Sequence, residues 1–211
     1  MLAFGSASEL NREILVLLSI NKNKKPSLID YSIFVDRLRK IGIREINIEG
    51  ATQVGSRLLL VNRGNQTNRK NHLIITTPDF WKDQEHCTIV VHELSTAVAQ
   101  SDFLGVSEVH YVKSIDLLLF TFTSESTMNS YDDGIIGESY LGWIRSASKN
   151  RLDSVTELRR LSDIHGELKG QKIEGVCADE IGEDYLQLHL VADNDEGESK
   201  LFKVEMTLDE R

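Results

Sequence analysis

The sequence is poor in proline and cysteine, with two of each in 211 residues. Cys177 lies between Val176 and Ala178, and Cys87 stands just before the apolar pair Ile89 and Val90. Such cysteines are more often buried thiols than partners in a disulfide. We therefore expect no disulfide framework.

Long hydrophobic runs are also missing. The longest apolar segment, "ILVLL", extends from Ile14 to Leu18. This is far short of the roughly 18 residues that a membrane helix requires. The N-terminal residues have neither a basic stretch nor a long apolar stretch, so the chain as given carries no secretory signal. We expect a cytoplasmic protein with no membrane partner.

Basic residues are outnumbered, with 24 Lys and Arg against 33 Asp and Glu, for a formal net charge of −9. A duplex nucleic-acid binder needs a basic face, so this class is excluded. An acidic surface suits small-molecule ligands or cations. A hydrophobic content of 40% is enough for a real core, and we treat residues 1–211 as a single domain.

The chain does contain internal repeats. Three segments each open with a glycine and small residues, continue through a polar turn into an apolar strand, and end in a polar cluster. They are Ile48–Asn65, Leu104–Ser126 and Ile173–Asp195. Repeats of this length indicate stacked units that cannot bury their faces alone.

Each repeat reads as several short strands joined by Gly- and Asn-rich turns, which is typical of a β-propeller blade. We predict an all-β protein with about four blades of an incomplete six-bladed ring and one or two short helices. An α+β fold is the alternative, because Leu152, Val155, Leu158 and Leu161 have helical spacing and residues 26–42 can also be read as a helix.

Four stretches carry a family resemblance: "LAFGSASELNR", "INIEGATQVGSRLLLVNRGN", "FTSESTMNSYDDGIIGESYLGWI" and "KIEGVCADEIGEDYLQLHLVADND". In this order they resemble landmarks of an uncharacterised bacterial β-propeller family, related in pattern to esterase-like phytase and gluconolactonase-type propellers. The resemblance implies that this chain corresponds to the C-terminal two thirds of that family. It implies a fold but no reaction, because the family has no settled activity.

An arc of propeller blades leaves its two end faces and its last strand edge, "KLFKVEM", uncovered. Exposed strand edges and apolar faces are association sites. We therefore expect self-association through the open blade edges.

Charged residues stand at the ends of the expected inner strands, where the axial funnel of a propeller opens. A converging set of carboxylates and cations is a candidate ligand site. The candidates are Arg12, Glu49, Arg63, Glu125, Asp133, Lys172, Glu174 and Asp193.

Glu49 and Glu174 each follow Ile and precede Gly, so an inner strand would aim both carboxylates the same way, with Leu104 at the third equivalent position. They are candidate Ca²⁺ ligands, or they are structural latches that hold backbone amides of a neighbouring blade. Arg63 and Lys172 either hold an anionic ligand or neutralise the two glutamates.

The sequence contains no nucleophile elbow and no zinc-binding helix, and no histidine lies near enough to the candidate serines to nominate a catalytic triad. The first functional hypothesis is therefore a ligand-binding propeller whose funnel holds a small anionic molecule or a cation. The alternative is a calcium-dependent hydrolase of esters, lactones or phosphate esters. The sequence leaves enzymatic activity open.

Overall fold

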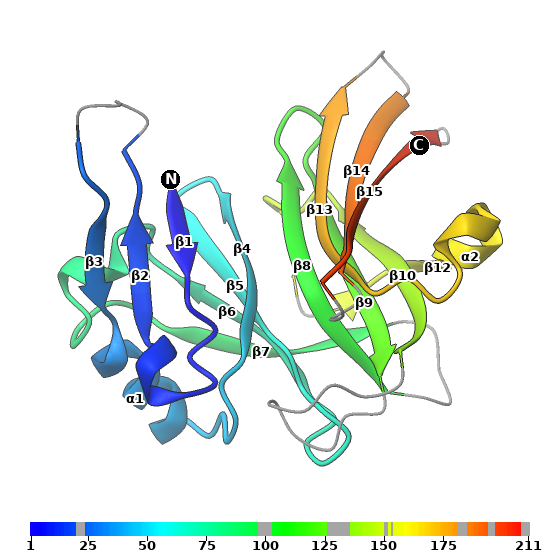
Figure 1. Cartoon of the computed structure of the whole chain (residues 1–211). Coiled ribbons are helices and arrows are strands. Elements are labelled where there is room, and N and C mark those ends of the chain that lie inside the picture. The colour runs from blue at the N-terminus through cyan, green and yellow to red at the C-terminus, as the bar shows by residue number, and fades with distance from the viewer. Residues whose placement is uncertain are drawn as a thin grey trace.

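The computed structural model describes residues 1–19, 24–96, 103–125, 136–149, 152, 154–180, 185–193 and 197–207. Its strands form four separate sheets, numbered here first to fourth along the chain (Figure 1). No helix in the described part of the chain is long and apolar enough to cross a membrane.

The first and second sheets come from the N-terminal half of the chain. The first contains, in spatial order, β1 (Leu2–Phe4), β2 (Ile14–Leu17) and β3 (Ser27–Asp30), and is followed by α1 (Ser32–Lys40). The second contains β4 (Ile48–Val54), β5 (Arg57–Asn62), β6 (Asn71–Thr76) and β7 (Val90–Thr96). A short later strand, β11 (Ser154–Val155), pairs parallel to β7 at the outer edge.

The third and fourth sheets follow. The third contains β8 (Leu104–Val112), β9 (Leu117–Glu125), β10 (Ile136–Arg145) and β12 (Glu157–Arg160). After it come the short helix α2 (Leu161–Ile164) and a 3₁₀ turn (Gly166–Leu168). The fourth contains β13 (Ile173–Glu180), β14 (Tyr185–Asp193) and β15 (Ser199–Thr207).

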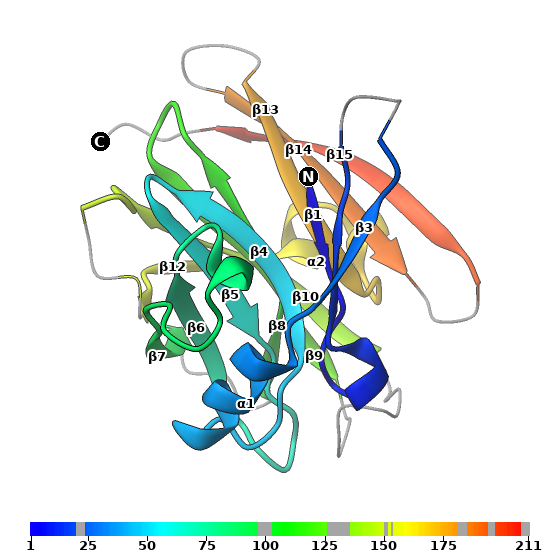
Figure 2. The ribbon, with the colours of Figure 1, turned by 90° about the vertical axis from the view of Figure 1, so that its left-hand side faces the viewer.

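The first strand of each sheet lies toward the middle of the molecule, and we call β1, β4, β8 and β13 the inner strands (Figures 1 and 2). The amide of Ile48 donates to the carbonyl of Ser6 over 2.8 Å, which ties β4 to the segment after β1. β8 contacts both β4 and β13. The later strands of each sheet lead outward.

Three hydrophobic cores fill the spaces between successive sheets. The central strands serve two cores at once, because successive side chains point to opposite faces. On β5, Leu58 and Leu60 face the first sheet and α1, whereas Leu59 and Val61 face the third sheet. The uninterrupted apolar run in β5 follows from burial on both faces.

Polar side chains bridge neighbouring sheets at equivalent places. Asn71 on β6 donates to the carbonyl of Leu104 over 2.7 Å and accepts the amide of Val106 over 3.1 Å. Ser139 on β10 donates to the carbonyl of Gln171 over 2.7 Å and accepts the amide of Ile173 over 3.1 Å. Each bridge thus holds a carbonyl and the amide two residues later at an inner strand of the next sheet.

The prediction of a mainly β chain with one or two short helices is confirmed. The two segments with helical spacing each contain both strand and helix. Residues 27–30 are strand β3 and residues 32–40 are helix α1, while residues 154–160 are strand apart from Thr156 and precede the four-residue α2. Both cysteines are free thiols as expected, but the prediction that Cys177 is buried is wrong, because it lies exposed on β13.

The bridge at Asn71 gives a stability prediction. Asn71 is buried, and besides Leu104 and Val106 it accepts the amide of Gly64 over 3.1 Å. Asn71→Ala leaves these backbone groups without their partner, and we expect it to lower the free energy of unfolding by about 3 kcal/mol. Urea denaturation measures this loss.

The matched control is Gln53→Ala, which removes an exposed amide that donates to Gly55. We expect this variant to lose less than about 0.5 kcal/mol. Equal losses in the two variants would contradict a structural role for the Asn71 bridge.

Candidate charged site

Glu49 and Glu174 occupy the same special position in two inner strands. Pairing between β4 and β5 jumps from Ile48–Asn62 to Gly50–Val61, so Glu49 is an extra, bulged residue. Pairing between β13 and β14 jumps in the same way around Glu174. A bulge changes the direction of its side chain. The shared Ile-Glu-Gly sequence therefore corresponds to the same backbone irregularity in both strands.

Backbone hydrogen bonds confirm this equivalence. The amide of Arg63 donates to the carbonyl of Asn47 over 2.9 Å, and the amide of Asp193 donates to the carbonyl of Lys172 over 3.1 Å. Each bond closes the end of an inner strand two residues before the bulged glutamate. Arg63 and Asp193 are therefore structural counterparts, as are Asn47 and Lys172.

The structure brings four of the predicted site residues together: Glu49, Arg63, Lys172 and Glu174. The Nζ of Lys172 lies 3.1 Å from Oε1 of Glu174, and the Lys172 side chain is only 7% exposed. The charges of Arg63, Glu174 and Lys172 all act on Glu49. Residues from the second and fourth sheets thus meet beside β8 of the third sheet.

Glu49 is held by Asn47, whose Nδ2 donates to its carboxylate over 2.7 Å. Burial raises the pKa of Glu49, the positive charge of Arg63 opposes that rise, and the negative charge of Glu174 adds to it. These contacts differ from the predicted latch, because they go to side chains around the site. Asn71 and Ser139, by contrast, do bridge backbone groups.

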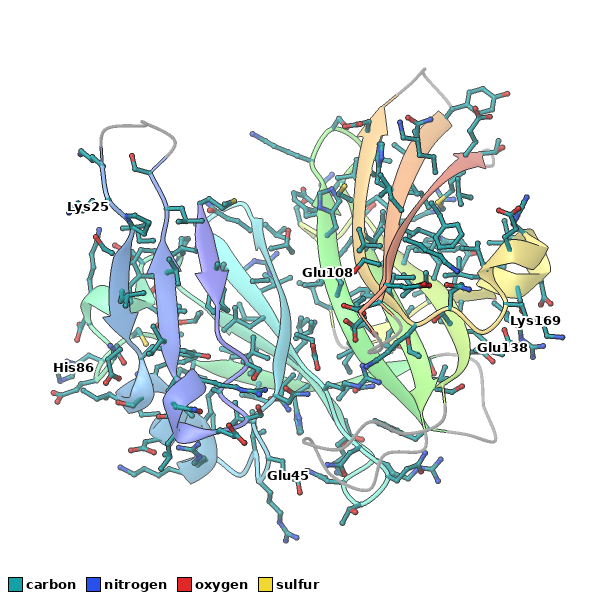
Figure 3. All side chains as sticks on the ribbon, viewed as in Figure 1. Lys25, Glu45, His86, Glu108, Glu138 and Lys169 are labelled. Carbon is teal, nitrogen blue, oxygen red and sulfur yellow. The ribbon has the colours of Figure 1, made fainter. Side chains whose placement is uncertain are left out.

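Glu108 is a further member that the sequence reasoning missed. It lies on β8, on the side that faces β4 (Figure 3), and its carboxylate accepts the amide of Val109 over 2.8 Å. It also accepts the amide of Ala51 on β4. Glu108 therefore performs across two sheets the latch role that was expected of Glu49 and Glu174.

The pKa of Glu108 rises from an ordinary 4.5 to about 7. Burial is the main cause, the negative charge of Glu49 adds to it, and the hydrogen bonds from Val109 and Ala51 partly oppose it. Such a carboxyl group is partly protonated at neutral pH.

Two glycines make room for this cluster. A Cβ at position 50 would clash with the carboxylate of Glu108 and lie 2.8 Å from the amide nitrogen of Val109. A Cβ at position 105 would lie 2.5 Å from Nε of Arg63. Gly50 thus lets β4 and β8 approach closely, and Gly105 lets the largely buried Arg63 side chain pass over β8.

The other predicted site residues are placed differently. Arg12 is exposed in a 3₁₀ turn, where its Nε lies 3.7 Å from the carboxylate of Glu9 and its guanidinium donates to the hydroxyl of Ser8. Asp193 ends β14 and is half-buried. Glu125 ends β9, but its side chain is not described, and Asp133 lies outside the described residues. The prediction that Leu104 is the third equivalent of Glu49 and Glu174 is wrong, because the bulge on β8 falls at Ser107 and Leu104 lies in the hydrophobic core. The third carboxylate comes from Glu108, the residue after that bulge.

Among the described residues, no three His, Cys, Asp or Glu side chains gather as a metal-binding group. A cavity of about 600 Å³ lies elsewhere, between β10, β12, α2 and β15. A smaller one of about 370 Å³ lies between β15 and the segment around α2. None of the charged cluster residues lines either cavity.

One family model matches nearly the whole chain. The model of a family of unknown function, DUF6910, matches residues 1–197. The chain belongs to DUF6910. No curated protein and no solved structure matches it. The charged cluster of this DUF6910 chain, Glu49, Arg63, Glu108, Lys172 and Glu174, lies within the matched residues.

The raised pKa of Glu108 makes stability depend on pH. Between about pH 4.5 and 7 the folded protein holds a proton that the unfolded chain has released. The free energy of unfolding therefore falls as the pH rises through this window and levels off above it. The loss from this group is at most about 3 kcal/mol.

Glu108→Gln has no such titration, so its stability relative to wild type should increase from pH 5 to pH 8. Urea denaturation at several pH values measures the difference. The control is Glu85→Gln, which changes an exposed carboxyl group to an amide. Its free energy of unfolding should show the same pH dependence as that of wild type. A pH-independent difference between Glu108→Gln and wild type would overturn the assignment.

Proposed function

We propose that the four sheets are consecutive blades of an open β-propeller arc. The support is that each sheet starts at an inner strand, that a core fills each space between successive sheets, and that the bulges and bridges recur at equivalent positions. In this arrangement the charged cluster lies at the axis. Ligands of ring-like β folds commonly bind where several repeats converge.

We propose that the charged cluster binds a small molecule carrying an amine or another cationic group. The observation that supports this proposal is that the cluster has three carboxyl groups but only two cationic side chains to neutralise them. Arg63 acts on Glu49 and Lys172 pairs with Glu174, so each cation already has a carboxylate beside it. Glu49 and Glu108 nevertheless keep raised pKa values.

A cationic group placed beside Glu49 and Glu108 would supply the missing positive charge. It would favour the ionised carboxylates, whose oxygens accept charge-assisted hydrogen bonds. Lys172 holds the Glu174 carboxylate through its ion pair, and the charge of Arg63 favours the ionised form of Glu49. An added anion would instead stand beside three carboxylates and gain little.

A second candidate function is hydrolysis of an ester, a lactone or a phosphate ester. The observation in its favour is the pKa of Glu108, about 7, which suits a general base that activates water near neutral pH. A calcium-dependent form of this reaction would use Glu49 and Glu174 as metal ligands. Turnover of aryl esters, simple lactones or phosphomonoesters that is lost in Glu108→Gln would favour this candidate.

The binding proposal predicts selective stabilisation by cations. Putrescine, simple primary amines and Ca²⁺ serve as cationic probes, and acetate and inorganic phosphate serve as anionic probes. We expect a cationic probe to raise the melting temperature of the protein. Binding at pH 7 should also release protons, because a cation lowers the pKa of Glu108; calorimetry in two buffers of different ionisation enthalpy detects that release.

Matched variants locate the binding. Glu49→Gln and Glu108→Gln each remove one carboxylate and should weaken the binding of the cationic probe at least about tenfold. Glu85→Gln should leave binding unchanged. Stabilisation by the anionic probes alone, or equal binding by all three variants, would contradict the proposal.

A further inference from the structure

The outer edge of the fourth sheet is open. β15 pairs with β14 along its whole length, from Ser199 to Thr207. In the part of the chain that the structure describes, no strand pairs with the opposite edge of β15. An uncovered strand of this length presents a row of backbone donors and acceptors to another strand.

The two faces of β15 differ in chemistry. Phe202, Val204 and Met206 point toward the core between the third and fourth sheets and are half-buried against it. Lys203 and Glu205 lie on the opposite, exposed face. The strand therefore carries an apolar row on one face and a pair of opposite charges on the other.

Open space adjoins the apolar row. The cavity of about 600 Å³ is lined by Val204 and Met206 on β15 and by Ile164 on α2. The cavity of about 370 Å³ is lined by Phe202 and Val204 and again by Ile164. A strand added beside β15 would have room for its own apolar side chains between β15 and α2.

We propose that β15 pairs antiparallel with β15 of a second copy of this chain, with Val204 opposite the partner's Val204. Phe202 then stands opposite the partner's Met206, and Lys203 stands opposite the partner's Glu205. Two-fold symmetry repeats each of these pairs. The apolar rows of the two copies join on one face, and two opposite-charge pairs form on the other.

Other symmetric registers are less favourable. Centring the pairing on Lys203 or on Glu205 puts like charges directly opposite each other, which destabilises a strand pair. Centring it on Phe202 leaves Lys203 opposite Leu201 and Glu205 opposite Ser199. Shifting by one residue would place the apolar row of one copy on the charged face of the other. The complementary charges thus select the register centred on Val204.

The proposal predicts a dimer in solution at about 0.15 M salt, a concentration at which repulsion between two chains of formal charge −9 is screened. Sedimentation equilibrium measures the dissociation constant. Lys203→Glu and Glu205→Lys each turn two attractive pairs into repulsive ones and should raise that constant at least about tenfold. The double variant Lys203→Glu/Glu205→Lys restores both pairs and should dimerise like wild type.

Mixing the two single variants provides a further test, because misfolded variants would not regain the ability to dimerise when combined. The Lys203→Glu and Glu205→Lys proteins are each weakened alone, but an equal mixture has opposite charges in every pair and should form heterodimers. Lys113→Glu, an exposed charge reversal in the turn between β8 and β9, is the control and should remain dimeric. A monomeric wild type, single variants that dimerise like wild type, or a mixture that stays monomeric would each overturn the proposal.

Discussion

The close approach of β4 and β8 is the constraint on which the charged cluster depends. Gly50 permits it, because any larger residue would meet the Glu108 carboxylate and the backbone of β8. At this distance Glu108 accepts the Ala51 amide of the other sheet and loses much of its contact with water. Tyr111 on β8 adds a second link by donating its amide to Thr52 over 3.1 Å. The same contact that joins the two sheets thus also raises the pKa of the Glu108 carboxyl group.

The rest of the fold repeats one plan with small changes. Each space between sheets is filled by alternate side chains of central strands such as β5, and Asn71 and Ser139 fasten the next inner strand. Within the part of the chain that the structure describes, the first and fourth sheets each have a neighbouring sheet on one side only. Val191 on β14 and Leu201 on β15 are accordingly exposed, Leu201 by 61%. The charged cluster lies where the inner strands β4, β8 and β13 meet, and the uncovered surface lies on the first and fourth sheets.

The sequence predicted the parts that recur. Glu49 and Glu174 were paired from the shared Ile-Glu-Gly pattern, and Arg63 and Lys172 were chosen as cations at the ends of expected strands. The structure brings all four together. Their geometry depends on a bulge that both inner strands share, which a repeat comparison can detect. The short apolar segments between Gly- and Asn-rich turns likewise predicted strands.

The sequence could not predict the features in which β8 differs from β4 and β13. On β8 the bulge falls between Val106 and Glu108, so the carboxylate appears farther along the strand than in the other two copies. Only the three-dimensional contact with Gly50 identifies Glu108 as a member. Arg12 was included because it follows an inner strand, but its turn directs it to solvent beside Glu9.

Carboxylates from three sheets form one electrostatically coupled cluster. A ¹³C NMR titration of the glutamate side chains tests this coupling most directly. The account predicts a Glu108 carboxyl that titrates near pH 7 in the wild-type protein. In a Glu49→Gln variant the same resonance should titrate at lower pH, because a neighbouring negative charge has been removed. A Glu108 pKa near 4.5, or one that does not change when Glu49 is neutralised, would contradict the account.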